Sequence, residues 1–366
     1  MPPLSIMMKP ASGRCNMRCT YCFYADEIKH RSVAQYEFMS IRTLENIIKK
    51  AFDYAEGVCT FGFQGGEPTL IGLDFYKTMV ELVRKHNKKK IKVEYALQTN
   101  GLEVDEEWAE FFHNNDFLLG LSLDGVKSIH DTYRLDASGN GTFSRVMKTA
   151  HIFNKYNVKY NVLIVITNQI ASHINQVYNA LIHNGFFYQQ YIPCLDPLGE
   201  DRGKHPYSLT PQNYGNCLIR LFDAWYCDMA KGNEVYIRDF ENLAGMILGR
   251  FPERCGLSGV CRNQNVIEAD GSVYPCDFYV LDEFRIGNLN ENNFDELGRR
   301  CIEIGFVESS MRVEEICKTC KWVRFCRGGC RRDRQCKKLD EIGLNYFCSA
   351  YQLFYAHAIP KLLALI

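Results

Sequence analysis

Cysteine content constrains this chain more than any other feature, because 17 of its 366 residues are cysteines. Reducing compartments disfavour disulfides, so cysteine groups in a chain without an export signal usually hold metals or take part in catalysis. Eleven of the cysteines occur in spaced groups, and these are treated below. We expect the other six to be small buried or incidental residues, namely Cys59, Cys194, Cys217, Cys227, Cys301 and Cys336.

Charge and hydropathy exclude several classes of partner. Lysine plus arginine equals aspartate plus glutamate at 43 each, so no excess positive field is available to hold a nucleic acid. The N-terminus lacks the basic and apolar regions of a secretion signal, and no apolar run reaches the roughly 18 residues that a membrane span needs. We therefore expect a cytoplasmic protein with no nucleic-acid partner and no membrane partner.

The first two thirds of the sequence alternate β-rich runs with amphipathic helical runs, which is the pattern of a parallel sheet with crossover helices. The expected strands are Leu4–Lys9, Val58–Gln64, Val93–Gln98, Leu118–Leu123, Tyr160–Thr167 and Phe186–Pro193. The expected helices are Thr43–Glu56, Phe75–His86, Glu106–Asn114, Phe143–Asn157, Ser172–Asn184 and Tyr214–Lys231. Six such units are too few for a closed eight-unit barrel but enough for an open one, in which reactive groups lie at the carboxyl ends of the strands.

A change of character after Gly232 predicts a second, smaller domain, so we divide the chain into residues 1–232 and 233–366. Helical periodicity gives way there to cysteines, glycines and short hairpins. One hairpin is expected over Val266–Tyr274, because Asp270-Gly271 between β-forming residues is typical of a tight turn. A closing helix is expected around Cys348–Ile359, which Pro360 would stop or kink.

The first cysteine group, Cys15-x3-Cys19-x2-Cys22, directly follows the first expected strand. Three thiolates from one loop can hold an iron-sulfur cluster and leave one iron without a protein ligand, and such open positions are typical of catalytic metal sites. A zinc knuckle completed by a distant residue is the alternative. The same spacing with an aromatic residue at Tyr21 resembles the signature of the radical S-adenosylmethionine (radical SAM) superfamily.

A second motif, Gln64-Gly65-Gly66-Glu67-Pro68, ends the second expected strand, and its glycines allow the backbone to approach a ligand closely. It resembles the GGEP motif of the superfamily. The resemblance implies that the backbone of this turn and the carboxylate of Glu67 hold the methionyl amino group of S-adenosylmethionine.

Four further cofactor contacts are implied by the same resemblance. Ser122 and Arg134 would bind the methionyl moiety, and a planar guanidinium suits a carboxylate. Tyr21 and Leu195 would flank the adenosine. Ordinary barrel packing or a surface ion pair is the alternative for each of the four.

The C-terminal cysteines resemble the seven-cysteine SPASM pattern at every spacing, with Cys255 just upstream as an eighth. Eight thiolates can complete two four-cysteine sites, each holding a 4Fe-4S cluster in this family. By resemblance the first auxiliary cluster is bound by Cys255, Cys261, Cys276 and Cys330, and the second by Cys317, Cys320, Cys326 and Cys348. Two zinc ribbons are the alternative, since zinc also takes four-thiolate sites.

Within the SPASM group the sequence looks most like the anaerobic sulfatase-maturating enzymes. The resemblance is carried by segments that include Lys9-Pro10-Ala11-Ser12, Cys19-Thr20-Tyr21-Cys22-Phe23-Tyr24 and Tyr274-Pro275-Cys276-Asp277-Phe278-Tyr279. Similar enzymes convert a cysteine or serine of a sulfatase polypeptide into Cα-formylglycine. The implied partners are a sulfatase segment of the type Cys/Ser-x-Pro/Ala-x-Arg and a one-electron reductant such as flavodoxin or ferredoxin.

Oxidising a Cβ–H that bears a thiol or hydroxyl removes a hydrogen atom, an electron and a proton. The radical derived from the cofactor is expected to take the hydrogen atom, and an auxiliary cluster is expected to take the electron. The proton requires a base, and a carboxylate fits. Asp277 is our candidate, since it follows Cys276 directly and matches the position of the family's proposed proton acceptor. Gln64 and Tyr24 are expected to line the same chamber, because each borders a cofactor motif. A solvated hairpin aspartate is the alternative.

Two other functions remain open from the sequence. A SPASM enzyme could form thioether or carbon crosslinks in a ribosomal peptide, or epimerise its residues, but such enzymes often carry an N-terminal recognition domain and Cys15 leaves no room for one. A zinc protein or an electron carrier without catalysis is the alternative from another class. The choice between a cysteine and a serine target also stays open.

Overall fold

The computed structural model describes residues 3–339 and 341–364, and its contacts divide the chain into two compact units. The first unit contains Met1–Ser122, Arg134–Tyr160 and Arg262–Phe306. The second contains Leu123–Tyr133, Asn161–Cys261 and Val307–Ile366. Each unit therefore combines early and late segments of the sequence, and the domain boundary at residue 232 stays a prediction.

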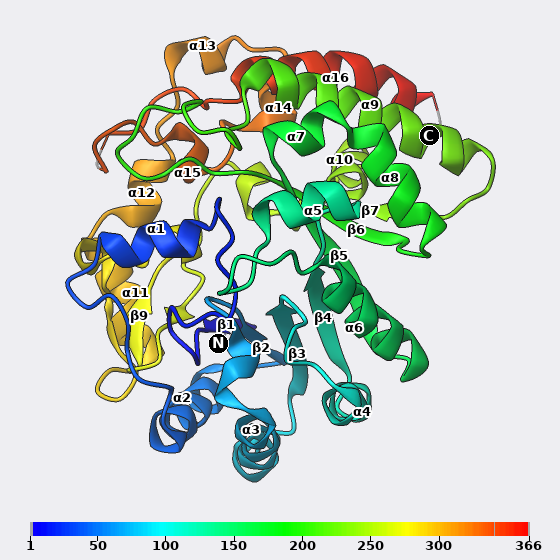
Figure 1. Ribbon diagram of the computed structural model, residues 1–366. Helices are drawn as coiled ribbons and strands as arrows, with labels where there is room; N and C mark the ends of the chain where they lie inside the picture. The colour runs from blue at the N-terminus through cyan, green and yellow to red at the C-terminus, as the bar shows by residue number, and fades with distance from the viewer. Residues whose placement is uncertain (1–2, 340, 365–366) are drawn as a thin grey trace. The chain divides into compact units, whose positions relative to one another are not determined.

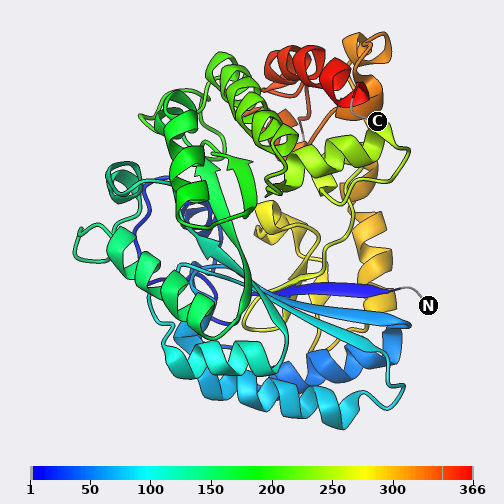
Figure 2. The ribbon, with the colours of Figure 1, turned by 90° about the vertical axis from the view of Figure 1, so that its right-hand side faces the viewer.

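The first unit is built on parallel strands that follow each other in sequence order. These are β1 (Leu4–Met8), β2 (Val58–Phe63), β3 (Lys92–Thr99) and β4 (Phe117–Ser122), paired in the order β1-β2-β3-β4 (Figure 1). The connecting helices are α2 (Ile41–Tyr54), α3 (Leu73–His86) and α4 (Glu106–Asn114), followed by α6 (Phe143–Lys155). Figure 2 shows α2, α3 and α4 on one face of these strands.

The helices cover the sheet because their apolar residues recur at helical spacing. In α2 the buried side chains Leu44, Ile47, Ile48 and Ala51 form one stripe, and Ser40 caps the helix by accepting a hydrogen bond from Thr43 N. Such a stripe must be buried against another element. Parallel strands covered in this way have all their carboxyl ends at one edge of the sheet, where the loops that follow them meet.

A late segment extends the same sheet beyond β1. The short strand β8 (Val266–Ile267) pairs in parallel with β1, and β9 (Ser272–Tyr274) pairs antiparallel with β8 and with β10 (Gly287–Asn288). The turn between β8 and β9 contains Gly271 at a φ of +89°. The predicted hairpin is therefore confirmed, and its pairing with β1 was not predicted.

The second unit contains β6 (Tyr188–Pro193), β7 (Tyr236–Ile237) and, from Asn161 onward, β5 (Lys159–Ile166). These strands pair in parallel in the order β5-β6-β7. Its long helices are α8 (Ile174–His183), α9 (Pro211–Ala230), α10 (Arg238–Ile247) and α16 (Cys348–Leu363). Helices α9 and α16 lie side by side (Figure 1). A Cβ at Gly215 of α9 would lie 3.1 Å from Ala350 Cα of α16, so glycine permits this close packing.

The six predicted strands are confirmed to within two residues, and the six predicted helices to within three. The predicted end of the last helix is wrong, because α16 continues past Pro360 to Leu363. Proline removes a single N–H, and the turn after it is closed by Ala364 N donating to Pro360 O over 3.2 Å.

The predicted loss of helices after Gly232 is also wrong, since α10 and α11 (Phe294–Glu303) follow it. A capping box formed by Asn293 and Glu296 starts α11. Over the described ranges no helix combines the length and the apolar character that crossing a membrane requires.

Candidate active site

Three loops meet at the carboxyl edge of β1, β2 and β3, and hydrogen bonds join them. The first carries Cys15, the second the Gly65-Gly66-Glu67 turn and the third Asn100. Glu67 N donates to Arg14 O over 2.7 Å, and Asn100 N donates to a carboxylate oxygen of Glu67 over 2.7 Å. Asn100 Nδ2 lies 3.7 Å from Cys15 Sγ. The predicted motifs are therefore gathered at one place in the first unit.

Glycine at position 66 is required by contact with the cysteine loop. Its φ is +48°, and a Cβ there would lie 2.2 Å from Arg14 O and 2.9 Å from Ser12 O. At Gly65 a Cβ would lie 2.4 Å from Cε of Lys9. Both glycines thus allow close contact between protein segments. The approach of a ligand to this turn stays a prediction.

The carboxylate of Glu67 joins two loops. Its Oε1 accepts hydrogen bonds from Thr69 N (3.1 Å), Thr69 Oγ1 (2.7 Å) and Thr99 Oγ1 (2.8 Å), and its Oε2 accepts from Asn100 N. A carboxylate has about four acceptor sites, so these donors use most of its capacity. The contact of Glu67 with a methionyl amino group stays a prediction.

Tyr21, Cys22 and Arg134 lie close together beside the cysteine loop. The guanidinium carbon of Arg134 is 5.5 Å from the centre of the Tyr21 ring, and both residues are buried. Burial raises the pKa of the Cys22 thiol, and the charge of Arg134 opposes this. Burial also raises the pKa of Cys15 to about 11, with the charge of Glu67 adding to the effect.

The other two predicted cofactor contacts are Ser122 and Leu195. Ser122 ends β4, where its Oγ accepts a hydrogen bond from Gln98 Nε2 over 3.0 Å. Leu195 is half-buried and follows β6 in the second unit. The roles of both residues stay predictions.

Asp277 is buried in the first unit beside Tyr24 and Gln64. It begins a short 3-10 helix, η3 (Asp277–Tyr279), directly after Cys276. Its Oδ2 accepts a hydrogen bond from Tyr24 Oη at 2.6 Å and a longer one from Gln64 Nε2 at 3.4 Å. Its Oδ1 is buried and has no hydrogen-bond partner within the part of the chain that the structure describes. Asp277 is thus not the solvated hairpin residue of the alternative interpretation.

A buried charge network that the sequence does not predict lies next to this aspartate. Lys9 Nζ is 4.5 Å from the centre of the Tyr24 ring and 3.7 Å from carboxylate oxygens of Glu27 and Glu268. Arg31 donates to Glu268 over 2.7 Å. The Lys9-Pro10-Ala11-Ser12 segment by itself does not predict this network, since a lysine after a strand is usually a solvated residue.

The network determines the charge around Asp277. Burial raises the pKa of Asp277, while the Lys9 charge and the Tyr24 hydroxyl oppose this rise. Burial raises the pKa of Glu27 to about 8, again against the Lys9 charge. Lys9 and Arg31 together outweigh the burial of Glu268 and lower the pKa of that carboxyl.

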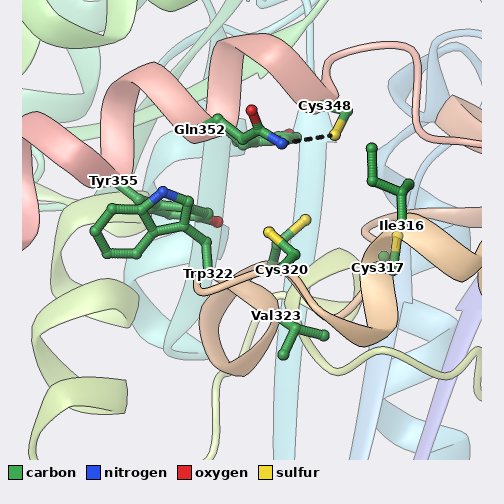
Figure 3. Close-up of a pocket in the computed structure, with 11 residues that line it drawn as sticks. Ile316, Cys317, Cys320, Trp322, Val323, Cys348, Gln352 and Tyr355 are labelled. Atoms are coloured by element: carbon green, nitrogen blue, oxygen red, sulfur yellow. Dashed lines mark hydrogen bonds between the residues drawn. The ribbon is translucent and has the colours of Figure 1, made fainter.

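Four cysteines of the second unit line one cavity. Cys317, Cys320, Cys326 and Cys348 line this cavity, which is partly open to solvent (Figure 3). The cavity is completed by Ile316, Val323, Tyr351 and Tyr355, and Gln352 Nε2 lies 3.7 Å from Cys348 Sγ. These are the four residues predicted to bind the second auxiliary cluster.

The second unit contains three of the four cysteines predicted for the first auxiliary cluster, namely Cys255, Cys261 and Cys330. Burial raises the pKa of the Cys330 thiol, and the charges of Cys261 and Cys255 add to this rise. Cys276 belongs to the first unit. Within residues 3–339 and 341–364, no group of three or more His, Cys, Asp or Glu side chains is close enough to hold a single metal ion. The four cysteines that line the cavity of Figure 3 form an all-thiolate donor set, and such a set suits iron-sulfur clusters.

Comparison with known proteins agrees with this geometry. The Radical SAM superfamily model matches residues 10–181, and the model of an iron-sulfur cluster-binding domain, SPASM, matches residues 255–321. A cysteine-type anaerobic sulfatase-maturating enzyme of Clostridium perfringens is 47% identical over 363 residues, which cover 99% of this chain and 98% of the relative. The chain belongs to the anaerobic sulfatase-maturating enzymes.

A more distant member of this family and one solved structure were also compared with the chain. A serine-type enzyme of Bacteroides thetaiotaomicron is 28% identical over 98% of this chain and 90% of its own length. The structure of native anSMEcpe with bound AdoMet and Cp18Cys peptide is 47% identical, has a TM-score of 0.95, and is matched over 100% of this chain and 99% of that one. The predicted fold class, a partial (β/α)6 radical SAM barrel followed by a SPASM domain, is confirmed.

Replacing Gly66 by alanine tests the contact between the two loops. A Cβ 2.2 Å from Arg14 O must displace the loop that carries Cys15, so we expect the Gly66→Ala enzyme to lose about four irons per chain, those of one cluster, when iron is measured after anaerobic reconstitution. Gly57→Ala is the matched control, because Gly57 also has a positive φ but nothing lies within 4 Å of its Cβ position. Equal iron in the two variants would contradict this role of Gly66.

Proposed function

We propose that this chain oxidises the target cysteine of a sulfatase polypeptide to Cα-formylglycine under anaerobic conditions. The observation that carries the proposal is the buried Asp277, whose Oδ1 has no hydrogen-bond partner among the described residues while Tyr24 and Gln64 donate to Oδ2. The close relatives that are 46–48% identical are cysteine-type enzymes, and the serine-type enzymes are 28% identical. Cysteine is therefore the proposed target.

The cofactors are S-adenosylmethionine and three 4Fe-4S clusters, and we propose the eleven spaced cysteines as the cluster ligands. Cys15, Cys19 and Cys22 would hold the first cluster, with Cys255, Cys261, Cys276 and Cys330 holding the second and Cys317, Cys320, Cys326 and Cys348 the third. When bound, these groups would supply a radical that removes one hydrogen atom and an acceptor for one electron. The proposed contacts of S-adenosylmethionine are Tyr21, Gln64, Gly65, Gly66, Glu67, Ser122, Arg134 and Leu195.

The residues around Asp277 would handle the proton. Loss of a hydrogen atom, an electron and a proton from the Cβ and thiol of the substrate leaves a thioaldehyde, and water converts this to the aldehyde with release of hydrogen sulfide. Oδ1 of Asp277 is the proposed proton acceptor, because it is the oxygen that no described donor occupies. Tyr24 and Gln64 would orient the carboxylate, and Lys9 would balance the negative charge around it.

We propose further that the substrate segment is of the type Cys-x-Pro-x-Arg and that a flavodoxin or ferredoxin supplies the electron that starts each turnover. The protein would work in the cytoplasm. The net charge of zero agrees with a partner other than nucleic acid.

Product mass tests the proposed reaction. Reduced enzyme is incubated without oxygen with S-adenosylmethionine and a peptide containing Cys-x-Pro-x-Arg, in parallel with a matched peptide containing Ser-x-Ala-x-Arg. We expect formylglycine and hydrogen sulfide from the cysteine peptide, and a slower reaction of the serine peptide. A crosslinked or epimerised peptide, or cofactor cleavage with neither peptide altered, would overturn the proposal.

Asp277→Asn separates proton removal from radical formation. Asparagine preserves the shape but loses basicity, so we expect formylglycine production to fall by roughly a hundredfold or more, the usual effect of losing a general base. Iron content and cofactor cleavage should stay near those of the parent enzyme. Asp295→Asn, an exposed position on α11, is the matched control. A near-normal yield from Asp277→Asn would show that another group takes the proton.

Iron content tests the ligand assignment. Three clusters of four irons give about twelve irons per reconstituted chain, and replacing Cys15, Cys19 and Cys22 by alanine should leave about eight and abolish cofactor cleavage. Replacing Cys59, Cys217 and Cys301 instead should leave about twelve, because these cysteines are buried elsewhere. If cofactor cleavage persists in the variant that lacks Cys15, Cys19 and Cys22, the Cys15 loop is not the radical-forming site.

A further inference from the structure

Helix α15 (Arg331–Arg334) follows Cys330 directly and carries arginines at unusual depth. Arg331, Arg332 and Arg334 are only 3–5% exposed. Arginine is almost never fully buried without compensating groups, because removing a charge from water costs several kcal/mol. The neighbours of each guanidinium therefore indicate what the charge is for.

Arg334 is linked by hydrogen bonds to the loop that carries Cys261. Its Nη1 donates to Ser310 O over 2.8 Å. The hydroxyl of the same Ser310 accepts a hydrogen bond from Cys261 N at 2.9 Å. Ser310 thus lies between the Arg334 guanidinium and a proposed ligand of the first auxiliary cluster.

Arg334 also borders the cavity of the other four cysteines. Gly328 lines that cavity, and a Cβ on Gly328 would lie 3.5 Å from Arg334 Nη1. The Arg334 charge interacts with the thiols of Cys317, Cys261 and Cys330, which belong to both proposed ligand sets. Its hydrogen bonds go to the carbonyl oxygens of Ser310 and Gly343, which carry no formal charge.

We propose that Arg334 is a counter-charge shared by the two auxiliary clusters and promotes their acceptance of an electron. This proposal rests on the proposed ligand assignment. Four thiolates make each 4Fe-4S centre anionic, and reduction adds another negative charge. A buried cation beside both centres stabilises their reduced forms, because charge interactions are strong at low dielectric. Arg334 therefore raises the reduction potential of both clusters, which favours transfer of the substrate electron to them.

Arg332 provides a matched comparison on the same helix. It is as deeply buried as Arg334, but its Nη2 donates to Asp196 O over 2.6 Å, and its charge acts on Asp333 and Arg202. Substitution of Arg332 should therefore disturb packing to a similar degree without removing a charge shared by the two thiol groups.

The test is a redox titration followed by electron paramagnetic resonance. The full-length chain with Cys15, Cys19 and Cys22 replaced by alanine serves as the parent, so that only the auxiliary clusters contribute to the signal. Arg334→Gln, Arg334→Met, Arg334→Lys and Arg332→Gln are made in this background, and iron is measured for each. Two neutral substitutions are included so that the titration does not depend on one variant that fails to load its clusters.

We expect Arg334→Gln and Arg334→Met to lower the midpoint potentials of both clusters by at least 59 mV, a tenfold change in the reduction equilibrium of a one-electron couple. Arg334→Lys keeps the charge but loses the fork of hydrogen bonds. Its midpoint potentials should stay near those of the parent, as should those of Arg332→Gln. Unchanged potentials in the neutral variants, or an equal fall in Arg334→Lys, would overturn the role of the charge. A parent that holds no iron would overturn the ligand assignment itself.

Discussion

The hydrogen bonds of one buried carboxylate, Glu67, hold together the part of the molecule on which the chemistry depends. Four donors from its own turn and from the end of β3 converge on it, and its backbone N–H binds the loop before Cys15. They connect the loops that follow β1, β2 and β3, and a direct hydrogen bond from Asn100 Nδ2 to Asn16 Oδ1 (2.8 Å) adds to this connection. A buried carboxylate that accepts four hydrogen bonds is held rigidly, because losing a donor leaves part of it buried without a partner, at the cost of its desolvation.

The second constraint is the pairing of β8 with β1. It brings Cys276 and Asp277 into the unit that also contains Tyr24 and Gln64, although more than 200 residues separate these positions in the sequence. Sheet pairing fixes the backbone at this position, and the side-chain hydrogen bonds then fix the carboxylate. Lys9 directly follows β1, and its side chain packs against Gly65 in the space that a Cβ would occupy. Its positive charge acts on three nearby carboxyl groups, those of Glu27, Glu268 and Asp277.

Much of this could be predicted because the signals are local. Strand and helix periodicity gave the elements of the first two thirds, and cysteine spacing identified the loops at Cys15 and Cys317. The importance of Lys9, Glu27 and Glu268 could not be predicted, since each is an ordinary charged residue until the fold buries it. The same holds for Arg334, whose neighbours come from the end of α12 (Phe306–Ser310) and from the loop at Gly343. The division into interleaved units could not be predicted, because it depends on the pairing of the late β8–β9 hairpin with the free edge of β1.

That interleaving affects how the protein can be made. The edge of β1 that β8 covers stays unpaired until residue 267 has been synthesised, which at 5–20 residues per second is roughly 10–50 s after β1 itself. An unpaired strand edge is a template for pairing with other chains. The nascent polypeptide therefore carries an aggregation-prone edge for most of its synthesis, and a product truncated within the second unit's middle segment, residues 161–261, would carry it permanently.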